Sequence, residues 1–491
     1  MKSEEYDISL KCPYSEPVSL IRRYALGKSA TLIVFFLIAS GVFIVSLALP
    51  GPSAIIFNTA IILAVLILQV RRLGVELSGP LLLFTLTMFV FVWARPLIAF
   101  SSNIFDLRYI AVLSGIQVSS LELKIYYSSI VASMVGFSST ILALQLSTNK
   151  PKRLTGIRSF SSRYLQAWSV TFWLGAASSL VQTFFYIRYY LNGGTYYQLY
   201  VQGHNSVGIP GISLISSLMF YGYVGLLLTT RKGGEISARN RRKIWSGVFV
   251  VLTLLDVTHG ARGGAFTQLL VGVWLKSFTA SDRIRIRTWL ISGTGLFLVS
   301  QAVSTIRSGS MELFGSKTIL KIVEWFLYVQ GLSGELVAPA SRLFGVKLEN
   351  IRFIIFPLLA PVRKILDPSF GQQTVQAGQS SGLLAQELAY RVAPQYFLAG
   401  HGAGSSYIAE TYCVFGIVGV FLATALLTWL VSRGPLLINR SCTGLFVFSS
   451  CLPFILFMPR ESLVFFVVPG LKAFLILFGV LKLRKALCLL R

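Results

Sequence analysis

The sequence predicts an all-α, polytopic integral membrane protein, and three observations lead to this fold class. Hydrophobic residues make up 54% of the 491 residues and charged residues only 13%, and the mean hydropathy is +0.70. A soluble domain carries about 25% charged residues and could not bury so much apolar surface. Apolar stretches of roughly 17 to 25 residues recur along the chain, the length that a helix needs to cross a bilayer, and in lipid only a helix satisfies the backbone of such a stretch.

About twelve such stretches can be recognised, and an even number of crossings returns the chain to its starting side. Residues 1–29 are polar and the first apolar stretch is long enough to span, so we expect no cleavable signal peptide. The predicted transmembrane helices cover residues 30–49, 53–70, 79–99, 125–146, 165–187, 211–229, 244–258, 265–278, 288–306, 406–431, 442–458 and 462–481.

The basic residues set the predicted orientation. The chain carries 44 Lys and Arg against 18 Asp and Glu, a formal net charge of +26. This excess could indicate nucleic-acid binding, but most of the basic residues lie in short clusters between apolar stretches. Because basic residues stay on the cytoplasmic side, both termini are predicted to be cytoplasmic. The clusters are residues 1–29, 71–72, 147–164, 230–243, 276–287, 432–440 and 482–491.

Residues 307–405 are predicted to form one large loop on the outer side, inserted between spans 9 and 10 of a single transmembrane domain that covers residues 1–491. Within this loop, residues 317–330 place polar side chains at helical spacing opposite an apolar face. This pattern indicates an amphipathic helix that lies in the membrane interface or packs on the bundle. Residues 351–360 are apolar, too short to span and interrupted by Pro357, so we interpret them as an interfacial or re-entrant element.

Charged side chains near the outer ends of spans are the candidates for function, because they take no part in setting the orientation. One outward-facing polar cavity could gather several of them. The predicted topology gives this set as Arg95, Arg188, Asp256, His259, Arg262, Arg307, His401, Glu410, Arg460 and Glu461.

The first motif is DVTHGARGG, residues 256–264, a tight glycine turn between two predicted helices. Its glycines allow backbone N–H groups to approach a ligand, the following helix begins with a positive dipole end, and Arg262 adds a fork of donors. Together these groups suit a phosphate. The alternative is a plain glycine turn in which Arg262 reaches lipid headgroups.

The second motif is GHGAGSSYIAETYCVFGIVGVFL, residues 400–422, where a Gly- and Ser-rich loop enters a predicted span. Glu410 lies within the first two turns of that helix, so the helix dipole favours its carboxylate, and a capping role alone is an alternative to catalysis. His401 precedes it in the loop and is either a candidate base or a solvated loop histidine. Gly416 and Gly419 are expected to allow close helix packing.

The third motif is FMPRESLVFF, residues 457–466, in which Pro459, Arg460 and Glu461 form the whole connection between the last two spans. Arg460 either lines the outer cavity or only pairs with Glu461 at the headgroup level.

No cofactor or metal is expected from the sequence. It contains no Walker loop, no GxGxxG after a strand and no Asp-x-Asp pair for a metal-bound nucleotide sugar. Its three histidines lack partners at metal-ligand spacing. Its five cysteines show no zinc spacing, so we interpret them as small apolar residues.

Taken together, the motifs resemble those of the O-antigen polymerases of the Wzy type, the oligosaccharide repeat-unit polymerases of bacterial envelopes. Three features carry the resemblance: the HGARGG turn (259–264), the G-x-G-x-S…E-x-Y…F-G-x-x-G run from Gly402 to Gly419, and the Pro-Arg-Glu-Ser turn (459–462). A plan of many helices with one large periplasmic loop also matches. The resemblance covers the chain by motif from about residue 244 onward, and only by helix number before that.

The resemblance implies a glycosyltransferase of the bacterial inner membrane that polymerises undecaprenyl-diphosphate-linked oligosaccharide repeat units at the periplasmic face, for O-antigen or a related surface polysaccharide. It implies as partners these lipid-linked oligosaccharides, membrane lipids, and a chain-length regulator and a flippase of the same pathway. No nucleic acid is expected to bind.

Guanidinium groups suit a metal-independent transfer, because they bind a diphosphate bidentately and stabilise the negative charge that grows on it as it leaves. Direct displacement would invert the anomeric centre. The side chains expected to bind the diphosphate are those of Arg262, Arg460, Arg307 and Arg95. Those expected to take the proton of the acceptor hydroxyl are Glu410 or His401. The residues expected to support these loops are Gly263, Gly264, His259, Gly402 and Gly404.

Three alternatives stay open at this stage. An O-antigen ligase would use the same donor but a lipid A core sugar as acceptor. A flippase or transporter for lipid-linked sugars would favour charges along a central path and repeated halves, which the sequence does not show. A membrane subunit without activity of its own would use its outer arginines only for assembly.

Overall fold

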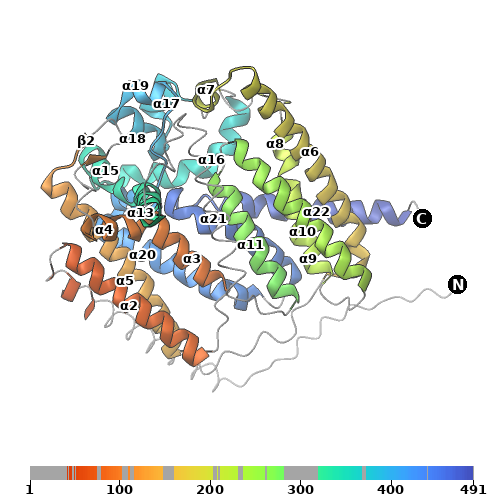
Figure 1. Ribbon diagram of the computed structural model, residues 1–491, viewed down its shortest axis with the longest axis horizontal. Helices are drawn as coiled ribbons and strands as arrows, with labels where there is room; N and C mark the ends of the chain where they lie inside the picture. The colour runs from red at the N-terminus through yellow and green to blue at the C-terminus, as the bar shows by residue number, and fades with distance from the viewer. Residues whose placement is uncertain are drawn as a thin grey trace.

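The computed structural model describes residues 51–73, 79–101, 109–110, 116–147, 160–202, 211–230, 236–259, 262–280, 319–367, 372–438 and 441–489, with single residues or short pieces between 41 and 49 and at 207 and 209. This part of the chain is almost entirely helical (Figure 1), which confirms the predicted all-α class. Its one β element is a short antiparallel hairpin of β1 (Tyr109–Ile110) and β2 (Ile116–Gln117).

Most of the helices form one bundle. They are α2 (Gly51–Leu73), α3 (Pro80–Met88), α4 (Ala94–Ser101), α5 (Ser120–Ser147), α6 (Leu165–Leu191), α8 (Ile212–Ser216), α9 (Leu218–Thr229), α10 (Ile236–Leu255), α11 (Arg262–Ala280), α20 (Tyr407–Ile438), α21 (Cys442–Phe457) and α22 (Val467–Leu489). Short π or 3-10 turns adjoin them at η1 (Phe89–Trp93), η3 (Ser162–Tyr164), η5 (Asp256–His259) and η8 (Met458–Arg460).

The other helices come mainly from the segment predicted as the outer loop. They are α7 (Tyr196–Gln202), α13 (Ile319–Gln330), α14 (Leu332–Glu335), α15 (Val337–Phe344), η7 (Leu348–Ile351), α16 (Arg352–Leu366), α17 (Val375–Ser380), α18 (Leu384–Val392) and α19 (Pro394–Leu398).

Within the described ranges, six helices are long and apolar enough to cross a membrane, and each coincides with a predicted span. They are Pro80–Phe100, Ser120–Leu144, Leu165–Leu191, Ile212–Thr229, Tyr407–Gly434 and Cys442–Arg460. The helices α2, α10, α11 and α22 occupy four more of the predicted spans. The predicted span 288–306 and nearly all of 30–49 lie outside the described residues, so the count of twelve stays a prediction.

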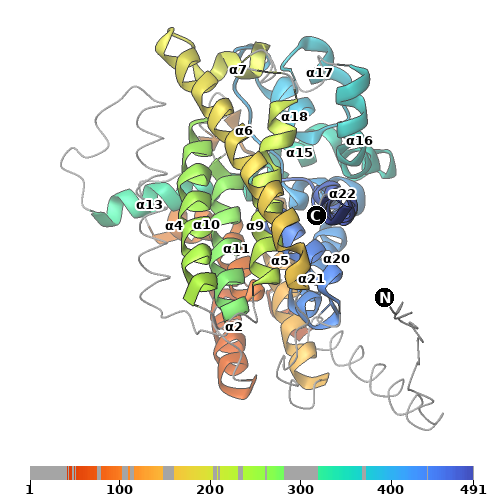
Figure 2. The same ribbon diagram turned by 90° about the vertical axis from the view of Figure 1, so that its right-hand side faces the viewer.

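Helices α15 to α19, which we call the cap, gather at one end of the bundle. Figure 2 shows the cap beside α7 and the end of α6. The helix α13 covers most of the predicted amphipathic segment 317–330 and runs across the direction of α10 and α11 (Figure 2). The predicted short element at 351–360 is part of a longer helix, α16, which contains both Pro357 and Pro361.

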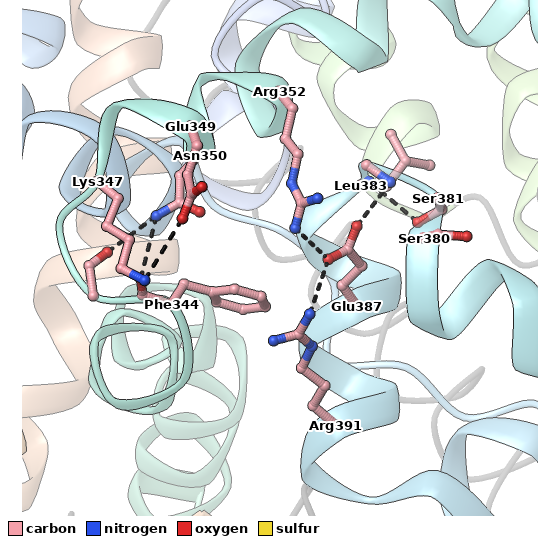
Figure 3. A network of polar contacts seen from close by, with 12 residues as sticks. Phe344, Lys347, Glu349, Asn350, Arg352, Ser380, Ser381, Leu383, Glu387 and Arg391 are labelled. Atoms are coloured by element: carbon pink, nitrogen blue, oxygen red, sulfur yellow. Dashed lines mark hydrogen bonds and ion pairs between the residues drawn. The ribbon is translucent and has the colours of Figure 1, made fainter.

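A buried carboxylate holds the cap together (Figure 3). Glu387 is fully buried; its Oε2 accepts a hydrogen bond from Arg352 Nη2 at 2.9 Å and lies 3.7 Å from Arg391 Nη2. Its Oε1 accepts a hydrogen bond from Gly382 N at 2.9 Å. Burial raises the pKa of Glu387 above its ordinary value, and this effect outweighs the opposing effect of the donors. The carboxylate thus ties α16 to both ends of α18.

Glycines bring helices α6 and α9 into close contact. A Cβ on Gly175 would lie 2.1 Å from Met219 N, and one on Gly222 would lie 2.6 Å from Phe172 Cα. The two backbones therefore approach at a distance that only glycine permits, which is how apolar helices gain contact in lipid.

Helix α20 consists of two arms rather than one straight helix. Gly416 has φ 64° and ψ −152°, a conformation that breaks the helix and that glycine adopts without strain. The Tyr407 hydroxyl and Thr424 Oγ1 are 2.8 Å apart. In a straight helix these residues would be separated by about 25 Å. The arms at residues 407–415 and 417–438 therefore fold back on each other.

The predicted span 406–431 is corrected by this fold-back, since only its later part, in the long arm, can cross a bilayer by itself. Gly419, expected to allow close helix packing, lies against the short arm, where its Cβ would lie 2.6 Å from Thr411 O. The break leaves the Cys413 carbonyl without a donor in its own helix. Lys347 N and Asn350 Nδ2 supply donors at 2.9 and 3.1 Å, and so attach the short arm to η7 and the residue before it.

Candidate functional site

Two of the predicted motifs meet at Glu410. This residue belongs to the short arm of α20 and is 1% exposed. Its Oε1 accepts a hydrogen bond from Ser405 Oγ at 2.9 Å. Its Oε2 accepts hydrogen bonds from Ser462 Oγ at 2.9 Å and from Leu463 N at 3.0 Å. The carboxylate therefore joins the loop before α20 to the turn that follows α21.

A second hydrogen bond fixes the same pair of segments, since Ser406 Oγ donates to Pro459 O at 3.1 Å. Ser406 is fully buried, and so is Ser462 apart from 4% of its surface. Three serine hydroxyls and one backbone N–H thus hold the 400–406 loop against the Pro-Arg-Glu-Ser turn. These hydrogen bonds are shielded from water, and a hydrogen bond is stronger in such surroundings than in solvent.

Arg460 extends from this turn towards α13. Its Nη1 donates a hydrogen bond to Gln330 Oε1 at 2.7 Å. This hydrogen bond orients the guanidinium towards the end of α13. The neighbouring Glu461 is a carboxyl group whose pKa burial raises to about 7, while the Arg460 charge lowers it.

The third motif, the HGARGG turn, reaches the same place. The 3-10 turn η5 ends at His259 and α11 begins at Arg262. A Cβ on Gly263 would lie 2.0 Å from Phe457 Cε2, so this glycine touches the ring that ends α21, three residues before Arg460. Gly264 has open space where a Cβ would stand. The side chains of His259 and Arg262, and the whole of Arg307, lie outside the described residues.

Arg95, another predicted phosphate ligand, lies in a different environment. It is 3% exposed, and its Nη2 lies 2.6 Å from Oε2 of Glu335, which is 1% exposed. Its Nη1 donates to Tyr328 O at 2.7 Å, and its guanidinium lies 3.8 Å from the centre of the Tyr328 ring. A Cβ on Gly331 would lie 2.5 Å from Arg95 Cβ. This arginine holds α4 against α13 and α14.

His401 does not contact the Glu410 carboxylate. Its ring is stacked on Tyr396 with 3.9 Å between ring centres, and the ring of Tyr197 lies 3.8 Å away. Its backbone O accepts a hydrogen bond from Gln373 Nε2 at 3.0 Å. The imidazole is half-buried between the cap and α7, at the outset of the loop whose far end binds Glu410.

The glycines of this loop differ in function. Gly404 has φ 78°, so it takes a left-handed conformation that lets the chain turn before Ser405. Gly402 is exposed and has an ordinary φ; a Cβ there would lie 3.3 Å from Gln373 Nε2, a tight contact. Gly400 has φ 94°, and a Cβ at this position would lie 2.2 Å from Tyr197 O. The absence of a side chain therefore allows the loop to approach α7.

One charged residue inside a predicted span, Lys472, was not among the predicted site residues. Lys472 lies in α22 and lines a cavity of about 520 Å³ together with Asp256 and with Lys364 of α16. A lysine among apolar residues of a span is a recognisable signal in the sequence, because lipid does not tolerate it unless it faces protein or water. In the described ranges, no three His, Cys, Asp or Glu side chains are grouped so that they could hold a metal ion.

Comparison with known proteins places the whole bundle in one family. No curated protein and no solved structure matches the chain. The family model described as O-antigen polysaccharide polymerase Wzy matches residues 30–487, nearly the full length, and so includes all three motifs. The chain is therefore an integral membrane protein that belongs to the Wzy family of O-antigen polysaccharide polymerases.

Proposed function

We propose that this chain is a glycosyltransferase that polymerises undecaprenyl-diphosphate-linked repeat units at the periplasmic face of the bacterial inner membrane. Its family implies polymerisation of repeat units in O-antigen biosynthesis. The distribution of basic residues supports cytoplasmic termini, with the cap, Arg460 and the HGARGG turn on the opposite side.

The observation that carries the proposal is the meeting of three distant motifs at one turn. The HGARGG turn touches Phe457, the 400–406 loop binds the Pro-Arg-Glu-Ser turn, and Arg460 projects from that turn. A turn that carries an arginine and lies beside the start of α11 suits a diphosphate.

Arg460 and Arg262 are proposed to bind the diphosphate of the donor, and Arg307 is proposed to join them from the segment that follows. In the reaction, the acceptor hydroxyl oxygen attacks the anomeric carbon of the donor glycan. The bond from that carbon to the diphosphate oxygen breaks, and undecaprenyl diphosphate leaves with the bonding electron pair. Guanidinium groups stabilise this growing charge more in the transition state than in the ground state, and the displacement inverts the anomeric centre without a metal.

His401 is proposed to take the proton of the acceptor hydroxyl. Its half-buried imidazole supports this role, and imidazole is the side chain most often used for proton transfer near neutral pH. Glu410 is proposed as a positioning residue, because its 1% exposure and its three hydrogen bonds suit a group that holds the loops. Arg95 is likewise proposed as a positioning residue, because Glu335 occupies its guanidinium.

The test is a deletion of the gene in its native host, complemented with variants, and a gel of the surface glycan. Arg262→Ala and Glu410→Ala are expected at normal abundance with single repeat units on the lipid A core, because export and ligation survive. Arg262→Lys restores little, since lysine lacks the planar fork. Arg484→Ala is the matched control, because this arginine binds the Tyr164 hydroxyl at the far end of α22.

Other outcomes of the deletion would overturn the proposal. Loss of all surface glycan with lipid-linked polymer accumulating identifies a ligase. Lipid-linked single units trapped on the cytoplasmic side identify a flippase. Normal polymer length in both alanine variants would show that the roles proposed for Arg262 and Glu410 are wrong.

A further inference from the structure

The cavity of about 520 Å³ beside the Glu410 turn is a second polar site, distinct from the arginines. Its walls come from α6, α8, α9, α11, α21 and α22, with η5 and a lysine of α16. Phe465 lines it, and Phe465 N donates to Ser462 O at 3.1 Å. Ser462 also binds Glu410, so the cavity and the proposed catalytic turn share one short segment.

Lys472 gives this cavity an uncompensated positive charge. Its ammonium lies 5.9 Å from the centre of the Tyr221 ring, and no carboxylate of the described residues lies within ion-pair distance of it. Tyr221 is itself fixed by a 3.4 Å hydrogen bond from its hydroxyl to Pro469 O. A charge in a membrane protein that lacks a fixed counterion and faces a cavity is a mark of ligand binding.

Lys364 adds a second positive charge from the cap. It is exposed, lines the same cavity and forms no ion pair with the described residues. Asp256 also lines the cavity, and its carboxylate accepts a hydrogen bond from Ser179 Oγ at 3.0 Å. Two lysines from elements far apart in sequence thus face one space, which suits an anion larger than a single carboxylate.

The remaining walls suit a sugar. Gln182 and Gln268 offer amide donors and acceptors, and Tyr186 and Tyr221 offer aromatic surfaces with hydroxyl tips. Gln182 Oε1 is already oriented by Ser216 Oγ at 2.9 Å. These amides, hydroxyls and aromatic faces are set among apolar side chains, which is the lining expected of a site for a ligand with a ring and polar substituents.

We propose that this cavity binds the diphosphate-linked sugar of the second lipid substrate, the acceptor, with its diphosphate between Lys472 and Lys364. The inference rests on the proposed function, because polymerisation requires two lipid-linked substrates at once. Donor and acceptor would then lie on either side of the Ser462 segment, with the arginines on the donor and the lysines on the acceptor. The same chemistry would also accept a phospholipid headgroup.

The experiment measures binding of undecaprenyl diphosphate to the purified full chain in lipid nanodiscs made of a neutral phospholipid. The wild type is expected to bind two molecules per chain. Lys472→Met keeps the length of the side chain and removes its charge, and is expected to leave one site, with affinity for the second weakened about tenfold or more. Arg460→Ala is expected to remove the other site. Lys472→Arg is expected to retain both.

A matched control and a competitor separate the possible outcomes. Lys482→Met changes a lysine of the same helix that lies over the Phe478 ring and does not line the cavity, so binding stays at two. If the wild type binds one molecule and Lys472→Met leaves it unchanged, the acceptor site is wrong and the proposed function stands. If the wild type binds none, the proposed function itself fails. If phosphatidylglycerol nanodiscs abolish only the Lys472-dependent binding, the cavity holds a lipid headgroup and the acceptor assignment is overturned.

Discussion

Arg95 and Arg460 contact the same stretch of chain, but through different partners. Arg95 is 3% exposed and faces the Glu335 carboxylate, whereas Arg460 is half-buried and donates to the neutral amide of Gln330. Gln330 ends α13 and Glu335 ends α14, so the two arginines meet the same stretch of chain. The comparison teaches that a charge at the end of a span does not by itself define a ligand site, because its partner decides what charge remains.

Loss of the Arg460 guanidinium is expected to have the largest effect. Arg460→Ala removes a donor that acts on the leaving diphosphate, and the turnover of lipid-linked repeat units in purified protein is expected to fall by about 10²- to 10³-fold. Arg460→Lys recovers little of this rate, because an ammonium cannot bind two oxygens in one plane. Abundance stays normal in both variants. Turnover within a few-fold of wild type in Arg460→Ala would contradict the proposal that Arg460, unlike Arg95, binds the diphosphate.

The contrasting change, Arg95→Met, is expected to act on stability. It leaves Glu335 buried without its partner, which costs about 3–5 kcal/mol, so the detergent-solubilised protein should unfold at a lower temperature and accumulate less in the membrane. The double variant Arg95→Met with Glu335→Met should regain most of this stability, because an apolar pair replaces the ion pair. If the Arg95→Met protein were stable but inactive, Arg95 would instead be assigned to the diphosphate site.

The different partners of these two arginines could not be predicted from the sequence, for a physical reason. Glu335 lies 240 positions after Arg95, and no local pattern reveals a partner at that separation. The fold-back of α20 was equally hidden, since residues 406–431 are apolar on both sides of Gly416 and a composition window cannot detect one glycine with positive φ. The helices at the other five spans could be predicted because hydropathy is a local property.

Glu410→Gln is expected to have a small effect and separates positioning from proton transfer. The amide oxygen can accept from Leu463 N, and the amide N–H₂ can donate to the Ser405 hydroxyl, so both loops stay attached. Turnover should therefore stay within about tenfold of wild type, whereas loss of a general base removes about 10²- to 10⁴-fold. Glu410→Ala, which removes every one of these bonds, serves as the comparison. A fall of a thousandfold in the glutamine variant alone would make Glu410 the base.

The smallest expected effect is a dependence on pH that arises beside Arg460 and is absent beside Arg95. Burial raises the pKa of Glu461 to about 7, so this carboxyl is mostly neutral at pH 6 and mostly ionised at pH 8. An ionised Glu461 competes with the diphosphate for the Arg460 charge. Binding of undecaprenyl diphosphate should therefore weaken by a few-fold as pH rises from 6 to 8.

The diphosphate's own ionisation contributes to the same pH range, so the measurement compares wild type with Glu461→Gln, which keeps the shape of the side chain and cannot ionise. Glu461→Gln should bind as the wild type does at pH 6 and more tightly than the wild type at pH 8. The neighbouring groups that share this field are Arg460 and the Glu410 carboxylate, and both are retained in the variant. Parallel pH profiles for the two proteins would mean that Glu461 keeps one charge state throughout, which contradicts the prediction.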